Sequence, residues 1–280
     1  MRKFILCICA VFLAAGVYSQ TGGEPLPGGT IRVSVDRQGR EAFKSRESIF
    51  NANGRIDEVI FFYWDASYSR EESQVRRSAS GTILEQIEFV YQDSRGPLIK
   101  KITRDAENRI RNSVIFEYNP QGRLSREAIV DERNRAISSY EYTYDSAGNQ
   151  IRRIFKDAQG ITMAETVYTF DNRRITRSET RDSGGNRISY TEYQYNSQGN
   201  LSVQLVHNAE GQIASTIRMT WQDGLEIKKE ILAADGTIQM EEINEYRDGL
   251  LRSKIIENIQ GKSTRRIAYG YSFGPGQQTR

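Results

Sequence analysis

Cysteine and histidine are almost absent from this sequence, which contains two cysteines, Cys7 and Cys9, and a single histidine, His207. Both cysteines lie in an N-terminal segment that we expect to be removed. The mature chain would then have no disulfide, no catalytic thiolate and no cysteine ligand for zinc. One histidine cannot form a histidine metal cluster, and a Ser-His-Asp triad could use only His207 as its base. His207 follows Leu205 at strand spacing, so we interpret it as a strand-end histidine.

A large net charge is also missing. The chain has 39 basic and 36 acidic residues, and loss of Arg2 and Lys3 would leave 37 against 36, a net charge of +1. Acidic and basic residues are interleaved, with no basic block. The sequence therefore indicates neither a nucleic-acid partner nor an anionic membrane surface.

The long apolar run of the chain lies between Phe4 and Val17, behind a short cationic start. It is too short to span a bilayer, and Val17 and Ser19 place small residues at the −3 and −1 positions of a cut before Gln20. This pattern predicts a signal peptide over residues 1–19 and no transmembrane helix after its cleavage. We expect an exported protein, located in the periplasm, at the cell surface or in the medium.

A lipoprotein anchor would have to use Cys7 or Cys9. Only Phe4, Ile5 and Leu6 of the apolar run precede Cys7, fewer than the ~7 residues that a signal peptide needs, so we do not expect a lipoprotein. Residues 20–30, rich in Gly and Pro, have no periodicity and predict a linker. A single repeat domain is predicted over 31–273, followed by a flexible tail over 274–280.

The rest of the chain is built on a repeat of 25 to 27 residues with two alternating turns. In the first series a large aromatic residue precedes each turn: Trp64, Tyr91, Tyr118, Tyr144, Phe170, Tyr195, Trp221, Tyr246 and Tyr271. In the second series each turn ends in Gly or Asn: Gly54, Gly81, Asn108, Asn134, Gly160, Gly185, Gly211, Gly236 and Gly261. The two series keep the same spacing, so one repeat is a strand, a turn, a second strand and a second turn.

The stretch Tyr140–Ile151 shows why each unit is a β-hairpin. Its three tyrosines alternate with Glu141 and Thr143, so the rings share one face of a strand. Asp145 can accept hydrogen bonds from backbone N–H groups of the turn, and Gly148 can supply the positive φ of a type I turn with a glycine bulge. Asn108 and Asn134 stand in for glycine because asparagine tolerates this backbone region.

Strands joined by such short turns must pair in an antiparallel meander. Ile213, Ile217 and Trp221 share one face, whereas Glu226, Lys228 and Glu230 are expected on the opposite, charged face, where charges would form cross-strand ladders. We expect an all-β fold of about 19 strands, roughly 90 Å wide if flat. Open sheets beyond ~10 strands curl or close, so we favour a curled or partly closed shell, barrel-like or sandwich-like, with exposed edge strands at its ends.

The turns carry a family resemblance. Tyr144-Asp-Ser-Ala-Gly-Asn149, Tyr195-Asn-Ser-Gln-Gly-Asn200 and Tyr118-Asn-Pro-Gln-Gly-Arg123 resemble the YD repeats of the Rhs family of exported bacterial proteins, and the resemblance extends from about Trp64 to Tyr271. It implies a hollow β-shell, which in long members encloses a toxic C-terminal domain, and a carbohydrate-binding or surface-binding role in shorter ones. Only nine residues follow Tyr271, and no aspartyl autocleavage signature is present, so a toxin role is not expected.

Chemistry-bearing clusters are missing. The adjacent acids Glu241 and Glu242 would point to opposite faces of a strand, as would Glu71 and Glu72. Aspartates recur at turns, where capping explains them better than calcium binding, which needs six or more oxygen ligands. These turn aspartates are Asp145, Asp157, Asp182 and Asp235. We therefore expect a protein that is not an enzyme and holds neither cofactor nor metal.

Aromatic residues are the remaining candidates for a binding surface, because planar rings with a polar edge suit stacking on sugars or contact with a protein. The candidates are Tyr140, Tyr142, Tyr193, Tyr195, Trp221, Tyr269 and Tyr271. The competing interpretation is that they are packing units, since a register repeated nine times serves the fold at every copy.

Three classes of function remain compatible with the sequence. The first is an exported, non-catalytic repeat protein that is structural or binds a glycan or an envelope protein through one face of the sheet. The second is an outer-membrane β-barrel, against which the apolar face is broken by charges such as Lys229 and Lys254. A truncated toxin shell and a glycan-active enzyme have least support, and the sequence indicates neither the partner nor the oligomeric state.

Overall fold

The computed structural model describes residues 34–36 and 38–273, and these residues form β-strands and turns. The predicted signal peptide over 1–19, the linker over 20–30 and the tail over 274–280 lie outside the described residues. In the described part no helix is present that could cross a membrane. The strands are β1 (Ser34–Val35), β2 (Glu41–Phe50), β3 (Ile56–Trp64), β4 (Glu71–Ser78), β5 (Ile83–Tyr91), β6 (Leu98–Asp105), β7 (Ile110–Tyr118), β8 (Leu124–Asp131), β9 (Ala136–Tyr144), β10 (Gln150–Asp157), β11 (Thr162–Asp171), β12 (Arg174–Asp182), β13 (Arg187–Tyr195), β14 (Leu201–His207), β15 (Ile213–Gln222), β16 (Leu225–Ala233), β17 (Ile238–Arg247), β18 (Leu250–Asn258) and β19 (Ser263–Phe273).

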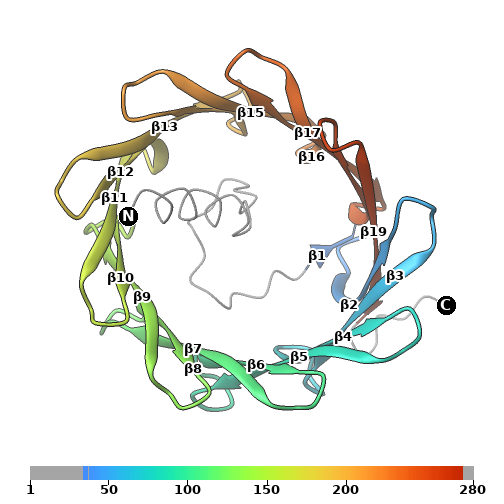
Figure 1. The fold of residues 1–280 in the computed structure, drawn as a ribbon. Coiled ribbons are helices and arrows are strands. Elements are labelled where there is room, and N and C mark those ends of the chain that lie inside the picture. The colour runs from blue at the N-terminus through green and yellow to red at the C-terminus, as the bar shows by residue number, and fades with distance from the viewer. Residues whose placement is uncertain (1–33, 37, 274–280) are drawn as a thin grey trace.

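The strands form a closed antiparallel barrel (Figure 1). From β2 onward each strand pairs with the next, and β19 pairs back with β2 from Arg266↔Phe50 to Phe273↔Ala42. The ring therefore contains 18 strands, and the short β1 adds to β2 outside this succession. The predicted meander of about 19 strands and its barrel-like form are confirmed. Closure is complete rather than partial. Within residues 38–273 the prediction of exposed edge strands at the ends of the sheet is wrong, because β2 and β19 hydrogen-bond to each other.

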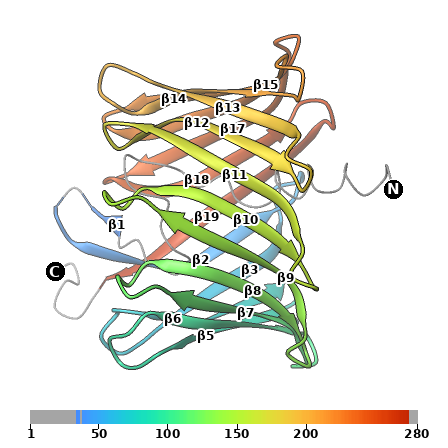
Figure 2. The same cartoon turned by 90° about the vertical axis from the view of Figure 1, so that its left-hand side faces the viewer.

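The barrel is wide. Eighteen strands at ~4.8 Å spacing and a tilt of ~40° give a diameter of roughly 35 Å. Figure 2 shows the strands inclined to the barrel axis, with the turns gathered at the two ends. Side chains fill a barrel of only about 8 strands, so this wall encloses a lumen.

The turns have the geometry that the sequence predicts. At Asp145 the backbone N–H donates to the carbonyl of Asn149, and the N–H of Gly148 donates back to the Asp145 carbonyl at 3.1 Å. Gly148 has φ +94°, and Asn108 and Asn134 have φ +64° and +59° in equivalent positions. The Asp145 carboxylate accepts the N–H of Asn149 at 2.8 Å. These contacts confirm a type I turn with a glycine bulge.

Some turns depart from this pattern. Between β11 and β12, Asn172 and Arg173 both have positive φ, which is the type I′ geometry of a two-residue hairpin. The last turn of the second series was expected to place Gly261 in the left-handed region. That expectation is wrong, because Lys262 has the positive φ, 48°, and Gly261 does not.

A β-bulge also overturns one predicted face. The register between β15 and β16 shifts between Thr220 and Trp221, so that Glu226 pairs with Trp221 and Lys228 pairs with Thr220. The strict alternation that places Glu226 with Lys228 and Glu230 is broken there. Glu226 lies instead on the same face as Trp221, where it is buried.

The two faces of the barrel wall differ in character. We call the face that carries the nine strand-ending aromatic residues, Trp64 to Tyr271, the aromatic face, and the other the ladder face. Mid-strand residues on the aromatic face are covered, such as Met219 at 7% exposure, whereas Tyr63 and Val167 on the ladder face are 45% and 43% exposed. Side chains converge on the concave side of a closed sheet and spread apart on the convex side. We therefore assign the aromatic face to the lumen.

A second observation supports this assignment. On β8, Glu127 of the aromatic face is within electrostatic reach of Lys101 on β6 and Arg153 on β10, each two strands away. On the ladder face, the charges that act on Glu165 of β11 are Arg152 and Arg181, on the adjacent strands β10 and β12. Long reach across the wall is what convergence of side chains on the concave side predicts.

Candidate functional site

All seven predicted aromatic residues lie on the aromatic face, but they are spread around the ring. Tyr140 and Tyr142 are on β9, Tyr193 and Tyr195 on β13, Trp221 on β15, and Tyr269 and Tyr271 on β19. They therefore do not form one site. They divide into residues that hold neighbouring hairpins together and residues that gather around buried charges.

The strand-ending aromatics tie adjacent hairpins together. Tyr195 Oη donates to the Ile175 carbonyl at 2.9 Å, and Trp221 Nε1 donates to the Leu201 carbonyl at 2.7 Å. Each acceptor lies 20 residues before its donor, and the same contact is made by Trp64, Tyr91, Tyr118, Tyr144, Tyr246 and Tyr271. Phe170, the ninth member of the series, has no donor. For Tyr195, Trp221 and Tyr271, packing and hydrogen bonding within the fold thus account for the constant register of the repeat.

A second group of aromatics surrounds Arg153. The Arg153 guanidinium lies 5.5 Å from the centre of the Tyr140 ring, and Tyr140 packs on Phe155 at 5.1 Å. Tyr193 Oη is 3.1 Å from the Ser178 hydroxyl. The charge of Arg153 also acts on Glu127, Tyr142, Tyr168 and Tyr193. We call these four residues, with Tyr140 and Arg153, the Arg153 cluster. It brings together side chains of β8, β9, β10, β11 and β13.

Burial sets the protonation of the Arg153 cluster. Burial raises the pKa of Tyr193 to about 12 and also raises the pKa of Tyr142, which hydrogen-bonds to Glu127. The pKa of Glu127 is raised as well, because burial outweighs the Tyr142 hydrogen bond and the nearby cations. The phenols are neutral hydrogen-bond donors at neutral pH, held beside a fixed cation. Such a surface can bind a ligand by stacking and by hydrogen bonds.

A second charged group lies on the aromatic face between β16 and β18. Glu242 forms ion pairs with Lys229 at 3.2 Å and with Lys254 at 3.0 Å. Lys229 is only 4% exposed. Burial raises the pKa of Glu242, but the two lysines outweigh it and lower the pKa overall. Burial raises the pKa of the neighbouring Glu226. Tyr269, one of the predicted binding aromatics, is near this group and has a pKa raised by burial and by Glu47.

The remaining candidates have structural partners. Glu241 pairs with Lys228 at 2.7 Å on the ladder face, whereas Glu242 points to the aromatic face, as predicted. Asp157 and Asp182 each cap their turns by accepting backbone N–H groups. Within residues 34–36 and 38–273 no group of three or more His, Cys, Asp and Glu side chains could hold a metal ion.

His207 ends β14, as predicted, and is buried on the ladder face. Its ring stacks on Tyr190 with centroids 4.2 Å apart, and its Nδ1 lies 3.1 Å from the Gly211 carbonyl. Nε2 is 3.5 Å from a Glu192 oxygen, and Arg177 lies on the Tyr190 ring at 3.9 Å. These contacts pack the end of the strand against its neighbours.

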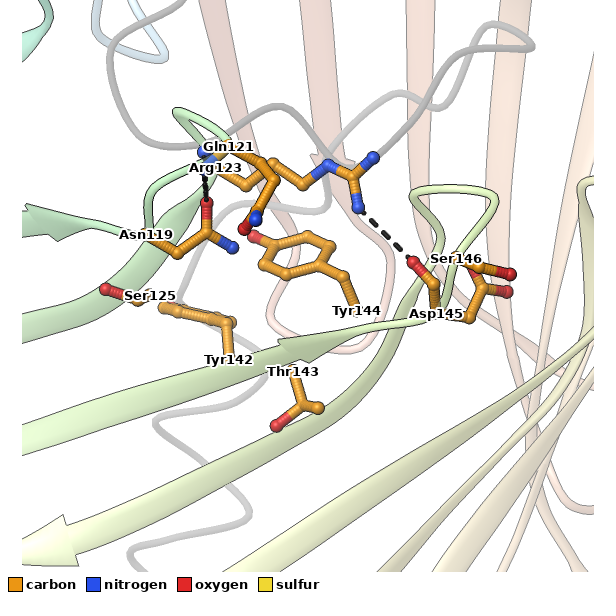
Figure 3. A pocket seen from close by; sticks show the side chains of 9 residues that line it. All are labelled: Asn119, Gln121, Arg123, Ser125, Tyr142, Thr143, Tyr144, Asp145 and Ser146. Carbon is orange, nitrogen blue, oxygen red and sulfur yellow. Dashed lines mark hydrogen bonds between the residues drawn. The ribbon is translucent and has the colours of Figure 1, made fainter.

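A shallow pocket of about 490 Å³ lies at one end of the barrel. Two neighbouring turns of the first series form it, 119–122 and 145–148. Figure 3 shows its lining residues, with Arg123 reaching across to the backbone of Asp145. The pocket is lined by Asn119, Gln121, Arg123, Ser125, Tyr142, Thr143, Tyr144, Asp145 and Ser146.

The pocket is held open by specific contacts. Arg123 Nη1 donates to the Asp145 carbonyl at 3.3 Å, and its guanidinium lies 5.6 Å from the centre of the Tyr144 ring. Tyr144 Oη donates to the Leu124 carbonyl at 2.8 Å. A Cβ on Gly148 would lie 2.8 Å from Arg123 Nη2, so glycine at this turn also leaves room for the guanidinium.

Sequence reasoning missed Glu127, Arg153 and Tyr168, because their proximity depends on the pairing of strands β8 to β11. It also missed the arginines of the rim, although these have a signal in the sequence. Three arginines stack on the aromatic residue 21 positions later: Arg70 on Tyr91, Arg123 on Tyr144 and Arg174 on Tyr195. A search for this spacing would have located the rim.

Comparisons with known proteins give likeness of structure only. No family model matches the chain, and no curated protein matches it in sequence. A porin-like protein from Bacteroides uniformis is similar at 11% identity and TM-score 0.43, covering 82% of this chain and 96% of that one. A porin-like protein from Bacteroides vulgatus has 10% identity and TM-score 0.32, with 82% and 98% coverage.

The structure of TcdB2-TccC3-Cdc42 is also similar, at 13% identity and TM-score 0.35, covering 85% of this chain and 16% of that one. The chain thus spans about a sixth of the length of that structure. At these identities and TM-scores the comparisons assign neither family nor function, and the resemblance to YD repeats continues to rest on the turn sequences.

Proposed function

We propose that the chain is an exported, non-catalytic β-barrel of the YD-repeat type that binds a glycan or an envelope protein through its aromatic face. The Arg153 cluster carries this proposal. Its tyrosines are neutral donors at neutral pH and surround a cation, and its one carboxyl group, Glu127, is hydrogen-bonded to Tyr142. Rings with polar edges on a rigid wall form a binding surface that is organised before the ligand arrives.

Export is supported by the sequence of residues 1–19, where a cationic start precedes an apolar run and a cleavage pattern. We expect such a protein in the periplasm, at the cell surface or in the medium. The repeated turns from Trp64 to Tyr271 support YD-repeat membership by resemblance.

An outer-membrane barrel is the alternative, and the charges on both faces favour the aqueous protein over it. The convex face of a membrane barrel contacts lipid, and each Arg or Lys there costs about 2–4 kcal/mol at the bilayer midplane. The ladder face carries Arg152 and Arg218 in ion pairs inside their strands, with 45% and 53% of each side chain exposed, and Arg181 near the end of β12 with 53% exposed. The aromatic face holds Lys229 and Arg153. A barrel with this face toward lipid would therefore also have to place cations in the membrane.

The proposal is tested by capture from a cell-envelope extract. Immobilised mature protein is compared with Tyr140→Ser, which changes the Arg153 cluster, and with Tyr63→Ser, an exposed tyrosine on the ladder face. We expect the wild type and Tyr63→Ser to retain a specific protein or glycan and Tyr140→Ser to lose it, with all three folded by circular dichroism. Equal capture by the two variants, or none by the wild type, would contradict binding through the aromatic face.

A further inference from the structure

The pocket between turns 119–122 and 145–148 has the composition of a site for a small polar ligand. Its volume of about 490 Å³ lies in the range of ligand pockets, about 300–1,000 Å³. Two tyrosine rings, Tyr142 and Tyr144, contribute to the lining, and the polar groups around them are mostly planar amide, guanidinium and carboxylate groups. Planar groups of this kind bind two adjacent hydroxyls at once.

Hydrogen-bonding capacity is left over in this pocket. The Asn119 Oδ1 accepts the N–H groups of Gln121 and Arg123, which fixes the amide and leaves its NH₂ group for another acceptor. Within the part of the chain that the structure describes, the side chains of Gln121 and Ser146 make no hydrogen bond. Arg123 uses Nη1 toward Asp145, and a guanidinium has five N–H donors in all.

Charge selects the kind of ligand. The Arg123 cation is matched by the Asp145 carboxylate, whose pKa is lowered by hydrogen bonds from Asn149, so that it is ionised at neutral pH. The pocket therefore has one positive and one negative group and no net charge. The Asp145 carboxylate would repel a phosphate or a uronate, because all of them are anions. A neutral sugar hydroxyl can donate to Asp145 and accept from Arg123.

The aromatic part fits the same ligand. Tyr144 is fixed by its bond to the Leu124 carbonyl and by Arg123 on its ring, and Tyr142 by its bond to Glu127. Fixed rings lose little conformational freedom when a flat apolar surface packs on them. The C–H face of a pyranose is such a surface, and its rim of hydroxyls would face the amides of Asn119 and Gln121.

We propose that this pocket binds a neutral sugar unit of a glycan chain, with the C–H face of the sugar on Tyr142 and Tyr144 and its hydroxyls on Gln121, Arg123 and Asp145. The inference rests on the proposed binding function and names its ligand class. It places the first sugar contact at the mouth of the barrel, next to the Arg153 cluster through the shared Tyr142.

The test is calorimetric titration of the mature protein with cellohexaose, laminarihexaose and maltohexaose, and with hexagalacturonate as the acidic comparison. We expect saturable binding of a neutral hexasaccharide. Gln121→Ala should weaken it about fivefold, the loss of one neutral hydrogen bond, and Arg123→Lys about tenfold because the planar fork is lost. Gln159→Ala is the matched control, since Gln159 has the same turn position as Gln121 at the other end of the barrel and should leave affinity unchanged.

Binding of hexagalacturonate alone, binding of none of the four sugars, or equal loss in Gln121→Ala and Gln159→Ala would overturn the sugar pocket. The envelope capture separates this failure from failure of the proposed function. A protein captured through Tyr140 with no sugar bound would leave the binding barrel standing and remove only the sugar site.

Discussion

The two faces of the barrel wall both carry charged side chains, but they hold them differently. On the ladder face Arg152 and Glu165 pair at 2.5 Å with 45% and 30% of their side chains exposed. On the aromatic face Lys229 and Glu242 pair at 3.2 Å with 5% and 15% exposed. Of these two pairs, the one on the convex side is open to solvent and the one on the concave side is buried. The ladder face also holds one buried acid, Glu230, which pairs with Lys228 at 3.0 Å.

This difference shows where the barrel depends on particular residues. Exposed ion pairs gain little because water screens them, whereas a buried charge that loses its partner is costly. We therefore expect the ladder face to tolerate substitution. The aromatic face is demanding, and its tyrosines and buried charges would be affected by any ligand that enters the lumen.

Removal of a buried partner should have the largest effect. Glu242→Ala leaves Lys229 and Lys254 on the aromatic face without their shared carboxylate. We expect a loss of about 3 kcal/mol in the free energy of unfolding, measured by urea titration. A loss below about 1 kcal/mol would mean that water reaches Lys229 and that the two faces do not differ as described.

The buried glutamates of the aromatic face and the aspartates of the turns should change the stability of the fold in opposite directions as the pH falls. Burial raises the folded-state pKa of Glu127 and Glu226 above 4.5, so stability rises as pH falls through those pKa values toward 4.5. Hydrogen bonds from Asn149 and Asn186 lower the pKa of the turn carboxyls Asp145 and Asp182 below 3.8, so the stability they contribute is lost as pH falls below 3.8.

Calorimetry from pH 7 to pH 2.5 should therefore show the highest Tm at mildly acidic pH, near about pH 4. Glu127→Gln should reduce the rise on the way down from neutrality, because one of the raised acids is gone. A Tm that falls steadily from pH 7 would contradict the burial of these glutamates on the aromatic face.

Two turn glycines at the same end of the barrel test the rim contact. Gly122→Ala places a Cβ in open space at φ +75°, and Gly148→Ala places one at φ +94° and 2.8 Å from Arg123 Nη2. We expect about 1 kcal/mol for Gly122→Ala from the left-handed backbone alone. Gly148→Ala should cost about 0.5–1 kcal/mol more, as Arg123 leaves the Tyr144 ring. Equal urea midpoints for the two variants would show that the Arg123 contact contributes nothing.

The hairpin ties can be tested one at a time. Tyr118→Phe keeps the ring and removes the hydrogen bond to the Leu98 carbonyl, which is 2.7 Å long. We expect a loss of about 1 kcal/mol in urea unfolding. Phe170 cannot be tested in this way, because its side chain has no hydrogen-bond donor. Unchanged stability in Tyr118→Phe would show that these hydrogen bonds do not hold the hairpins together.

The ladder face should give the smallest effect. A double-mutant cycle on Arg152 and Glu165, both changed to Ala, should give a coupling energy of about 0.3 kcal/mol that disappears at 1 M salt. A coupling above about 2 kcal/mol would place this pair in a shielded environment and exchange the roles of the two faces.

Local chemistry made much of this fold predictable. The strands, the antiparallel order and the type I turns with Gly148 and Asn134 follow from side-chain alternation and backbone preference over a few residues. Closure did not follow, because the pairing of β19 with β2 depends on tilt and register summed over the whole ring. Glu226 was placed on the wrong face because a bulge, which the sequence does not mark, shifts the alternation by one residue.

The sequence predicted which kind of residue forms the candidate surface, but not which of these residues lie together. Tyr140, Tyr142 and Tyr193 were singled out as aromatics of one face, and they lie on one face. Their grouping around Arg153 depends on neighbours up to three strands away. The spacing of residues along the sequence does not predict contacts of this kind. Tyr195, Trp221 and Tyr271 are also on this face, but their hydrogen bonds serve the adjacent hairpins.

The central claim is that the chain forms an aqueous barrel with its ladder face in water. The most direct test is fractionation of cells that express the tagged protein. Membranes are washed with alkaline carbonate, and intact cells are treated with protease to separate internal from surface-exposed protein. We predict that the protein is recovered outside the cytoplasm and is released by carbonate without detergent. Retention in carbonate-washed membranes would contradict an aqueous barrel, because the charged ladder face would then have to lie against lipid.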